Sequence, residues 1–284
     1  MRTRSLIAAL AFSALALALL PASRAGAETA AQPSPPANSG AAPAPQATAP
    51  AGSAPSAIGA PPATAPTSAP AAPEERLSNE TTLTTWAHPV EEMSIFTRPD
   101  VHSRRVARVH LLTEDGFPEV YALLASRVVD GTTWIRMPIP GRPNGRVGWV
   151  LREALGGLHE THWRIVVNLG ERRLTALYDG RRRFVAPVGV GKPSTPTPTG
   201  HFWIRERFRL TSRSNPYWPY ALGTSDYSTL SEWPGGGVIG IHGDFGEPEK
   251  IPGDPSHGCV RMHDSDIAWL APRITLGTPV EIVR

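Results

Sequence analysis

The chain has 284 residues, of which 40% are hydrophobic, 31 are proline and one is cysteine. This length suffices for one or two globular domains together with unfolded sequence. The formal net charge of +3 would by itself suggest a nucleic-acid or membrane-surface partner. Three arginines, Arg2, Arg4 and Arg24, account for it, and residues 28–284 carry 25 charges of each sign. We therefore expect no nucleic-acid partner, and the single cysteine excludes an intrachain disulfide.

The first 27 residues have the pattern of a secretory signal peptide. A basic start is followed by an uncharged run from Ser5 to Leu20 and by the small residues Ala25-Gly26-Ala27. This order predicts export to the periplasm or cell wall with cleavage after Ala27. The alternative is an uncleaved anchor, although the run of 16 residues is shorter than the ~20 that span a bilayer. A lipoprotein anchor is excluded because no cysteine follows the run.

Residues 28–74 are predicted to form a disordered Ala/Pro-rich linker. From Thr29 to Pro73 the sequence has no charge and no histidine, and 17 of the 45 residues are alanine and 12 are proline. Such a segment buries too little apolar surface to offset its chain entropy. Whether it tethers the protein depends on whether the signal peptide is retained, and the sequence leaves this open.

Residues 75–157 are predicted to form a small β-barrel. Short apolar runs alternate with the turn signals Asp130-Gly131 and Pro143-Asn144-Gly145. The expected strands are residues 106–112, 119–125, 132–137 and 147–151. Trp134 and Gly148-Trp149-Val150 resemble the end of a bacterial SH3-like domain, which implies a possible wall-binding role. The alternative is that the two tryptophans are only core residues.

Residues 161–284 are also predicted to be mainly β, with a hairpin turn at Asp179-Gly180. The expected strands are residues 164–168, 173–178, 183–188, 201–205, 238–242 and 280–283. A short helix over 266–271 is predicted, capped by Asp264 or Ser265 and ended by Pro272. The segment from Thr195 to Gly200 holds two prolines, and we expect it to be a loop or edge that passes near the functional site.

The lone cysteine is the first candidate for chemistry. An unpaired thiol in an exported protein risks oxidation, so its presence suggests a use. Cys259 follows Pro252, Gly253 and Pro255, which favour a loop rather than the middle of a strand. The alternative, a small buried residue without chemical importance, is typical of cysteines inside regular elements.

A nucleophilic thiol needs an imidazole nearby, and two are available. His242 ends the predicted strand 238–242 and can project into a mouth closed by the Cys259 loop. His257 is only two residues from Cys259, and neighbouring turn residues usually diverge. His242 is therefore the better candidate base, and His257 the better structural or substrate-side donor. Gly258 allows a tight turn, so that the amides of Gly258 and Cys259 could stabilise an oxyanion.

The string His242-Gly243, then thirteen residues, then Ser256-His257-Gly258-Cys259-Val260-Arg261 resembles the signature of the YkuD-type L,D-transpeptidase catalytic domain. The resemblance covers nearly all of residues 161–284. It implies a β-rich fold and a cysteine that attacks the bond between the L-centre of a diamino acid and D-alanine in peptidoglycan stem peptides. A thioester forms, and an amine of an acceptor stem resolves it into a crosslink, or water resolves it as in a carboxypeptidase. Acylation by some β-lactams, especially carbapenems, is also implied.

Carried over to this sequence, the resemblance makes Cys259 the nucleophile and His242 the base, oriented by the Gly243 carbonyl. It places Ser256, His257 and Gly258 on the oxyanion side. Arg261 is expected to hold a stem carboxylate by bidentate hydrogen bonds. Many crosslinking members carry asparagine at that position, so donor preference and the choice between transfer and hydrolysis stay open.

Two other functions compete. A metal hydrolase or metal-binding module could use His242, Asp244, His257, Cys259 and His263, but no C-x-x-C pair or H-E-x-x-H helix is present. We therefore expect no metal and no other cofactor. A catalytically inactive wall-binding protein is the second alternative. The aromatic residues Trp203, Tyr217, Trp218, Tyr220 and Trp233 could form a substrate groove or lid, or could anchor loops in the core.

Overall fold

The computed structural model describes residues 72–232 and 234–284. The predicted signal peptide at 1–27, nearly all of the predicted linker at 28–74, and Trp233 lie outside the described residues. In the described part the protein is mainly β with one short α-helix, which confirms the predicted fold class. Within residues 72–232 and 234–284, no helix has the length and apolar character needed to cross a membrane.

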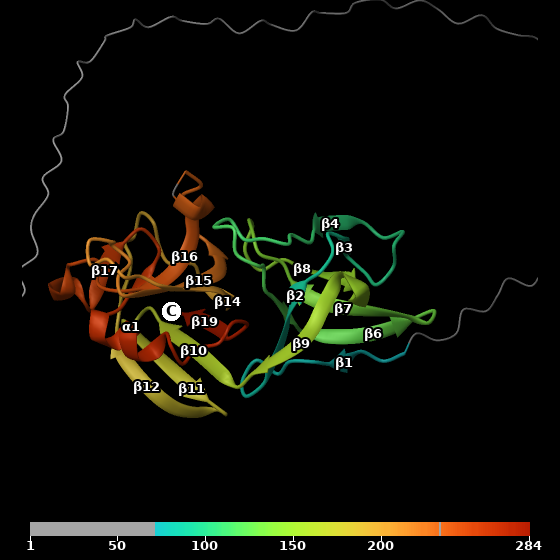
Figure 1. Ribbon diagram of the computed structural model, residues 1–284, viewed down its shortest axis with the longest axis horizontal. Coiled ribbons are helices and arrows are strands. Elements are labelled where there is room, and N and C mark those ends of the chain that lie inside the picture. Colours follow the sequence, from blue (N-terminus) through green and yellow to red (C-terminus); the bar gives the residue numbers. More distant parts are fainter. Residues whose placement is uncertain (1–71, 233) are drawn as a thin grey trace, which may run out of the picture. The chain divides into compact units, whose positions relative to one another are not determined.

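The amino-terminal block consists of two sheets (Figure 1). The six-stranded sheet has the order β1-β6-β7-β8-β3-β4, and the three-stranded sheet has the order β5-β2-β9. The strands are β1 (Glu75–Arg76), β2 (Thr84–Pro89), β3 (Ser94–Phe96), β4 (Arg105–Arg108), β5 (Tyr121–Leu123), β6 (Ala125–Val129), β7 (Thr132–Pro138), β8 (Val147–Leu151) and β9 (Leu155–Thr161). A 3₁₀ turn, Arg152–Ala154, joins β8 to β9.

Two of the strands predicted in this block are wrong in extent. The single strand predicted at 119–125 is split at Leu124, where the chain leaves the β5 sheet and enters the β6 sheet. Leu124 N–H donates to the Arg136 carbonyl, and the Leu124 carbonyl accepts from Leu77, so the bend is fixed by backbone bonds. The strand predicted at 106–112 ends at Arg108. Strands β1, β2, β3 and β9 were not predicted, because their apolar runs are short and irregular.

The predicted tight turns are confirmed by the backbone. Asp130 and Gly131 have φ values of 48° and 77°, and Asp179 and Gly180 have values of 51° and 70°. Two consecutive residues with positive φ are the mark of a type I′ hairpin turn, which favours Asp-Gly. Trp134 and Trp149 are 3% and 8% exposed and cluster with Phe96, so the structure favours core packing for both. The resemblance to an SH3-like domain stays a prediction.

The carboxy-terminal block is built on a ten-stranded mixed sheet in the order β12-β11-β10-β19-β14-β15-β16-β18-β13-β17. The strands are β10 (Trp163–Asn168), β11 (Arg173–Tyr178), β12 (Arg181–Pro187), β13 (Gly189–Gly191), β14 (Gly200–Arg209), β15 (Tyr220–Tyr227), β16 (Val238–His242), β17 (Gly253–Ser256), β18 (Val260–Arg261) and β19 (Pro279–Val283). Two 3₁₀ turns are present, Pro234–Gly237 and Pro248–Lys250. Strands 164–168, 173–178, 183–188 and 238–242 were predicted close to their observed bounds.

Helix α1 (Asp264–Leu270) packs its buried Ile267 and Leu270 into the core of this sheet (Figure 1). The predicted cap is wrong. His263 occupies the N-cap position without a side-chain hydrogen bond, because the Asp264 carboxylate instead accepts from the Asp244 amide. The Asp264 N–H in turn donates to the Asp244 carboxylate at 3.4 Å, so the start of the helix and the loop that follows β16 hold each other.

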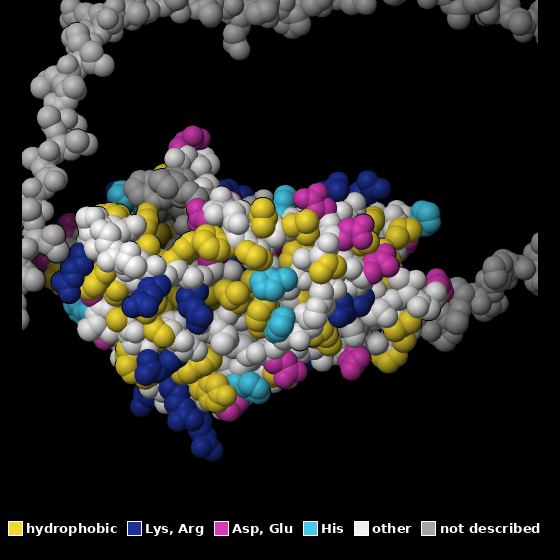
Figure 2. All heavy atoms as spheres, in the orientation of Figure 1, with side chains coloured by type: hydrophobic (Ala, Val, Ile, Leu, Met, Phe, Trp, Pro, Cys, Tyr) yellow, Lys and Arg dark blue, Asp and Glu magenta, His cyan; other side chains and the backbone are white. Residues whose placement is uncertain are grey.

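Surface charge is mixed in sign. Figure 2 shows Lys and Arg side chains gathered over the β11–β12 hairpin, where Arg181, Arg182 and Arg183 are exposed, and acidic side chains spread over the same face of the molecule. This agrees with the equal number of positive and negative residues after position 27.

Candidate active site

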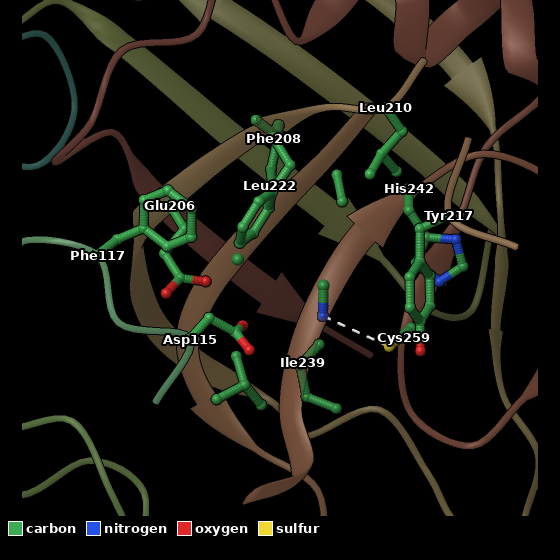
Figure 3. Close-up of a pocket in the computed structure, with 14 residues that line it drawn as sticks. Asp115, Phe117, Glu206, Phe208, Leu210, Tyr217, Leu222, Ile239, His242 and Cys259 are labelled. Atoms are coloured by element: carbon green, nitrogen blue, oxygen red, sulfur yellow. Dashed lines mark hydrogen bonds between the residues drawn. The ribbon is translucent and has the colours of Figure 1, made fainter. Parts of the chain in front are cut away.

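Cys259 lies beside the end of β16. Strand β16 runs parallel to β18, with Ile241 opposite Val260 and His242 opposite Arg261. One residue before Ile241 on β16, the Gly240 backbone nitrogen lies 3.5 Å from Cys259 Sγ. Because side chains alternate along a strand, His242 and Cys259 are diagonal neighbours on one face of the sheet. Both line the same groove, and Figure 3 draws them there together with Tyr217.

The His242 imidazole is held in one orientation. Its Nδ1 lies 2.9 Å from the Gly243 carbonyl, which only accepts, so Nδ1 carries the proton and Nε2 keeps its lone pair. The Tyr217 ring packs edge-to-face on it, with centroids 4.8 Å apart. A side chain at Gly243 would overlap the Trp218 carbonyl, so glycine is required there. The hydrogen bond between His242 Nδ1 and the Gly243 carbonyl is the contact that the resemblance implied for Gly243.

Burial keeps the imidazole uncharged. It lowers the pKa of His242 to about 4, an effect that the Arg261 charge reinforces and the Gly243 carbonyl opposes. Burial also raises the pKa of the half-buried Cys259 thiol, while the Gly240 N–H works in the opposite direction. Both groups are therefore neutral near pH 7. The His242 imidazole can accept the proton of the Cys259 thiol during attack, as in general-base catalysis. No thiolate needs to be formed beforehand.

Ser256 and Thr197 fix the turn that carries Cys259. The Ser256 hydroxyl donates to the Cys259 carbonyl at 2.6 Å and accepts from the Gly258 N–H at 3.1 Å. The Thr197 hydroxyl donates to the Gly258 carbonyl at 2.7 Å, so the 195–200 segment does pass next to the site. Gly258 has a φ of +131°, and a Cβ there would lie 2.6 Å from the Ile239 side chain.

These bonds correct the oxyanion prediction. The Gly258 amide was expected to face a developing oxyanion, but it is taken by the Ser256 hydroxyl two residues earlier. Of the two amides predicted, only that of Cys259 remains a candidate donor. Residues 253–256 also form a short edge strand, β17, where the prolines predicted a loop.

His257 faces a different partner. Lys192 Nζ lies 3.0 Å from its Nε2, and the Ser228 hydroxyl donates to its carbonyl at 3.2 Å. With Nε2 engaged by a lysine, His257 is less suited than His242 to take a proton from Cys259. Lys192 was missed, because nothing in the local sequence distinguishes it from a surface lysine.

Arg261 is already partly occupied. Its guanidinium donates to Glu247 at 2.8 Å and lies over the Phe245 ring, 4.4 Å from the centroid. The side chain is 8% exposed, and its Nε is buried without a partner. A ligand carboxylate at Arg261 would therefore compete with Glu247 or use the unpaired Nε.

Asp226 is a buried carboxyl that the sequence analysis missed. It is fully buried on β15, accepts a hydrogen bond from the Thr224 hydroxyl, and leaves its second oxygen without a partner. Burial raises the pKa of Asp226 to about 7. When ionised, it raises the pKa of the Cys259 thiol. No sequence pattern marks it, since residues 222–227 of β15 are all buried and the pairing with β16 shifts register between Gly223 and Tyr227.

Two cavities meet at Cys259 and His242. The larger, about 400 Å³, extends to Glu206 and Asp115. The smaller, about 160 Å³, extends to His257 and Arg261. The groove thus has a carboxylate-lined arm and a cationic arm, with the thiol where they join.

Of the aromatic residues considered, Tyr217 lines both cavities, which favours the groove interpretation for it. Trp203 is 3% exposed and donates from its indole to the Val120 carbonyl, so it anchors the core. Trp218 stacks with Arg213, and Tyr220 packs against the main core. Among the residues that the structure describes, no three His, Cys, Asp or Glu side chains converge to hold a metal ion.

A β-rich scaffold that brings a thiol and an oriented neutral imidazole into one groove is suited to acyl transfer through a thioester. The family model of the L,D-transpeptidase catalytic domain, YkuD, matches residues 162–282. The YqjB protein of Bacillus subtilis is 30% identical over 128 residues, which are 42% of this chain and 69% of that protein. The chain belongs to the YkuD family of L,D-transpeptidases.

Two further relatives differ in how much of the chain they match. The YkuD protein of Bacillus subtilis is 35% identical over 122 residues, which are 43% of this chain and 66% of that protein. The chain therefore spans just under two thirds of that relative's length. L,D-transpeptidase 1 of Mycobacterium tuberculosis is 27% identical over 210 residues, which are 69% of this chain and 79% of that protein. This last match is longer than the family domain itself.

Proposed function

We propose that this protein is a cysteine-dependent L,D-transpeptidase that crosslinks peptidoglycan stem peptides through a thioester on Cys259. The observation that carries the proposal is the His242 imidazole, neutral and oriented by the Gly243 carbonyl in the groove that Cys259 lines. Membership of the YkuD family supports the same reaction class.

In the proposed acylation step, Cys259 Sγ attacks the carbonyl carbon of the diamino acid while His242 Nε2 takes the thiol proton. The Cys259 amide stabilises the oxyanion of the tetrahedral intermediate. The intermediate collapses, the C–N bond to D-alanine breaks, and the imidazolium returns the proton to the departing amine. In the second step an acceptor amine attacks the thioester and loses its proton to His242. The C–S bond then breaks, and the sulfur regains the proton.

An extracytoplasmic location is part of this proposal, because peptidoglycan lies outside the cytoplasm. The signal-peptide pattern over residues 1–27 supports it. We also propose that the amino-terminal block contributes to wall binding, which its resemblance to SH3-like modules supports.

The test is mass spectrometry of the protein after incubation with a tetrapeptide stem ending in a diamino acid and D-alanine. We expect an adduct on Cys259 equal to the stem minus D-alanine, and crosslinked product when an acceptor stem is added. Cys259→Ser should lose most turnover, because the hydroxyl is much harder to deprotonate than the thiol. Carbapenem labelling of Cys259 reports that the thiol is competent. A labelled thiol that forms no stem adduct would contradict the proposal, and a trimmed stem without crosslinks would assign hydrolysis instead.

A further inference from the structure

The larger cavity has a floor made of glycine. Glu206 on β14 lies opposite Gly223 on β15, and Gly223 lies opposite Gly240 on β16. Gly240 in turn contacts Cys259 Sγ. At about 4.8 Å per strand, Glu206 and Cys259 are three strand spacings apart, roughly 14 Å between backbones. At the two positions between them, Gly223 and Gly240, the intervening strands carry no side chain, and Figure 3 shows the carboxylate and the thiol at opposite sides of this pocket.

Above Gly240 the cavity is open, because no other group packs closely against this glycine. A Cβ added at Gly240 would meet nothing closer than 3.6 Å, so no steric demand of the protein explains glycine there. At Gly223 the reason is different, because a Cβ would lie 2.6 Å from Glu206 Oε2. The Glu206 carboxylate therefore folds back over Gly223, one strand nearer to the thiol than its own backbone.

One oxygen of the Glu206 carboxylate lacks a hydrogen-bond partner. The residue is 5% exposed, and its Oε1 has no hydrogen bond although it lines the cavity. Asp115 lines the same end from the loop before Phe117. Burial raises the pKa of Glu206, and the nearby Asp115 charge adds to this, while a hydrogen bond from Thr113 opposes it. A buried carboxylate with an unpaired oxygen, here that of Glu206, is costly without a cation.

Aromatic rings complete the acidic end. Phe117 and Phe208 meet edge-to-face with centroids 5.0 Å apart, and both line the cavity. Carboxylates beside aromatic faces attract an ammonium group by charge and by cation–π interaction. The charge of the neighbouring Arg205 opposes the rise in the pKa of Glu206, but the ion pairs of Arg205 are with Glu119 and Glu114, and it forms none with Glu206.

We propose that Glu206 and Asp115 bind the side-chain primary ammonium of the diamino acid whose carbonyl acylates Cys259. The inference rests on the proposed function and names the donor feature that the site selects. An extended lysine-like side chain places its nitrogen roughly 7 Å from its carbonyl carbon. With one hydrogen bond added, this matches the two strand spacings, roughly 10 Å, between the Glu206 carboxylate and the Cys259 position.

The acceptor amine is a poorer occupant of this end. To attack the thioester it must be unprotonated and within roughly 3.5 Å of the carbonyl carbon. Carboxylates two strands away would hold it protonated and out of reach. A free carboxylate of either stem has a cationic group in the opposite arm, Arg261, where it would compete with Glu247.

The experiment compares two synthetic tetrapeptide stems as acyl donors, one with a free lysine side chain and one with that amine acetylated. The rate of thioester formation on Cys259 is followed by mass spectrometry in the full chain. We expect Glu206→Gln to slow acylation by the free-amine stem by about tenfold to hundredfold and to leave the acetylated stem unchanged. Gly223→Ala, which keeps the charge but displaces the carboxylate, should reduce the same preference. Glu171→Gln, in an exposed ion pair with Arg173, is the matched control and should change neither rate.

Each other outcome has a defined meaning. If neither stem acylates the unmodified protein, the proposed function fails. If both stems acylate it equally, or Glu206→Gln slows both equally, the function stands and the ammonium site is refuted. If Glu206→Gln alters only the later transfer to an acceptor stem, the acidic end serves the acceptor, and the assignment to the donor is overturned.

Discussion

Arg205 and Glu206 are adjacent on β14, yet they belong to two polar regions built in opposite ways. Arg205 donates to Glu119, to Glu114 and to the Tyr227 hydroxyl, and both Arg205 and Glu119 are at most 2% exposed. In this network each charge is paired. Glu206 faces the cavity of the active site and leaves a buried oxygen without a partner.

The same contrast extends around Cys259. Asp226 and Arg261 also keep a buried polar atom without a partner, and the thiol and imidazole are both neutral. In the Arg205 network a cation of the carboxy-terminal block binds acids of the amino-terminal block, and we expect this network to serve stability. Unpaired groups cost stability and are retained where a ligand or a reaction supplies the missing partner. Substitutions in the two regions should therefore separate activity from stability.

The largest effect is expected from His242→Gln. Without a base, thioester formation should fall on the order of 10²–10⁴-fold, because glutamine cannot take the thiol proton. In the unmodified protein the rate with the stem whose side-chain amine is acetylated, which does not depend on the Glu206 charge, should hold down to about pH 4 and then fall, since the imidazole is protonated below the lowered pKa of His242. The measurement is the acylation rate between pH 3.5 and 8.

His257→Gln is the comparison for that experiment. Its imidazole is engaged by Lys192, so we expect a milder loss than at His242. Should His257→Gln be the more damaging change, the two histidines would exchange roles. A decline of the rate near pH 6.5 instead of pH 4 would contradict the burial argument for His242.

The next largest effect is expected on stability at Arg205. Arg205→Met removes the cation and leaves Glu119 charged in the interior, which should cost about 3–5 kcal/mol in the free energy of unfolding. Urea denaturation measures this. The double variant Arg205→Met, Glu119→Gln removes the uncompensated charge and should recover part of the loss. A single variant as stable as the unmodified protein would show that the network is not structural.

Much of the fold was predictable because its signals are local. Asp130-Gly131 and Asp179-Gly180 fix hairpins through their own backbone preferences, and the long apolar runs of β7, β8, β11 and β16 identify strands. The switch of sheets at Leu124 was not predictable. It depends on the first half of one apolar run pairing with the distant β2, while the second half pairs with β7, the next strand along the chain.

The site divides in the same way. Cys259 and His242 could be selected because a thiol and an imidazole at a strand end carry recognisable chemistry, and the resemblance to a known family implied Gly243. Lys192, Glu206 and Asp226 could not, because their importance arises from burial and from the order of strands, which no spacing in the chain reveals. The occupation of the Gly258 amide likewise depends on the rotamer of Ser256.

The smallest effect is expected on the pH dependence of the free energy of unfolding, at Asp226, and its sign is the most specific. Its pKa in the folded state is raised to about 7 from an ordinary value of 3.8. The stability it contributes is therefore present below pH 3.8 and is lost as the pH rises towards 7, by ~2–4 kcal/mol. His242 acts in the opposite direction. Its pKa is lowered from 6.5 to about 4, so its contribution is present above pH 6.5 and lost as the pH falls to 4.

Asp226→Asn should remove the pH dependence of stability that Asp226 causes and leave the one that His242 causes. The difference in unfolding free energy between the variant and the unmodified protein should grow in favour of the variant from pH 4 to 7 and stay constant above pH 7. Urea denaturation at several pH values gives this difference directly, and groups unaffected by the substitution cancel in it. Adding His242→Gln to Asp226→Asn should flatten the remaining slope between pH 4 and 6.5. A difference that does not change with pH would mean that Asp226 is ionised in the folded protein, with a cation or water at its second oxygen.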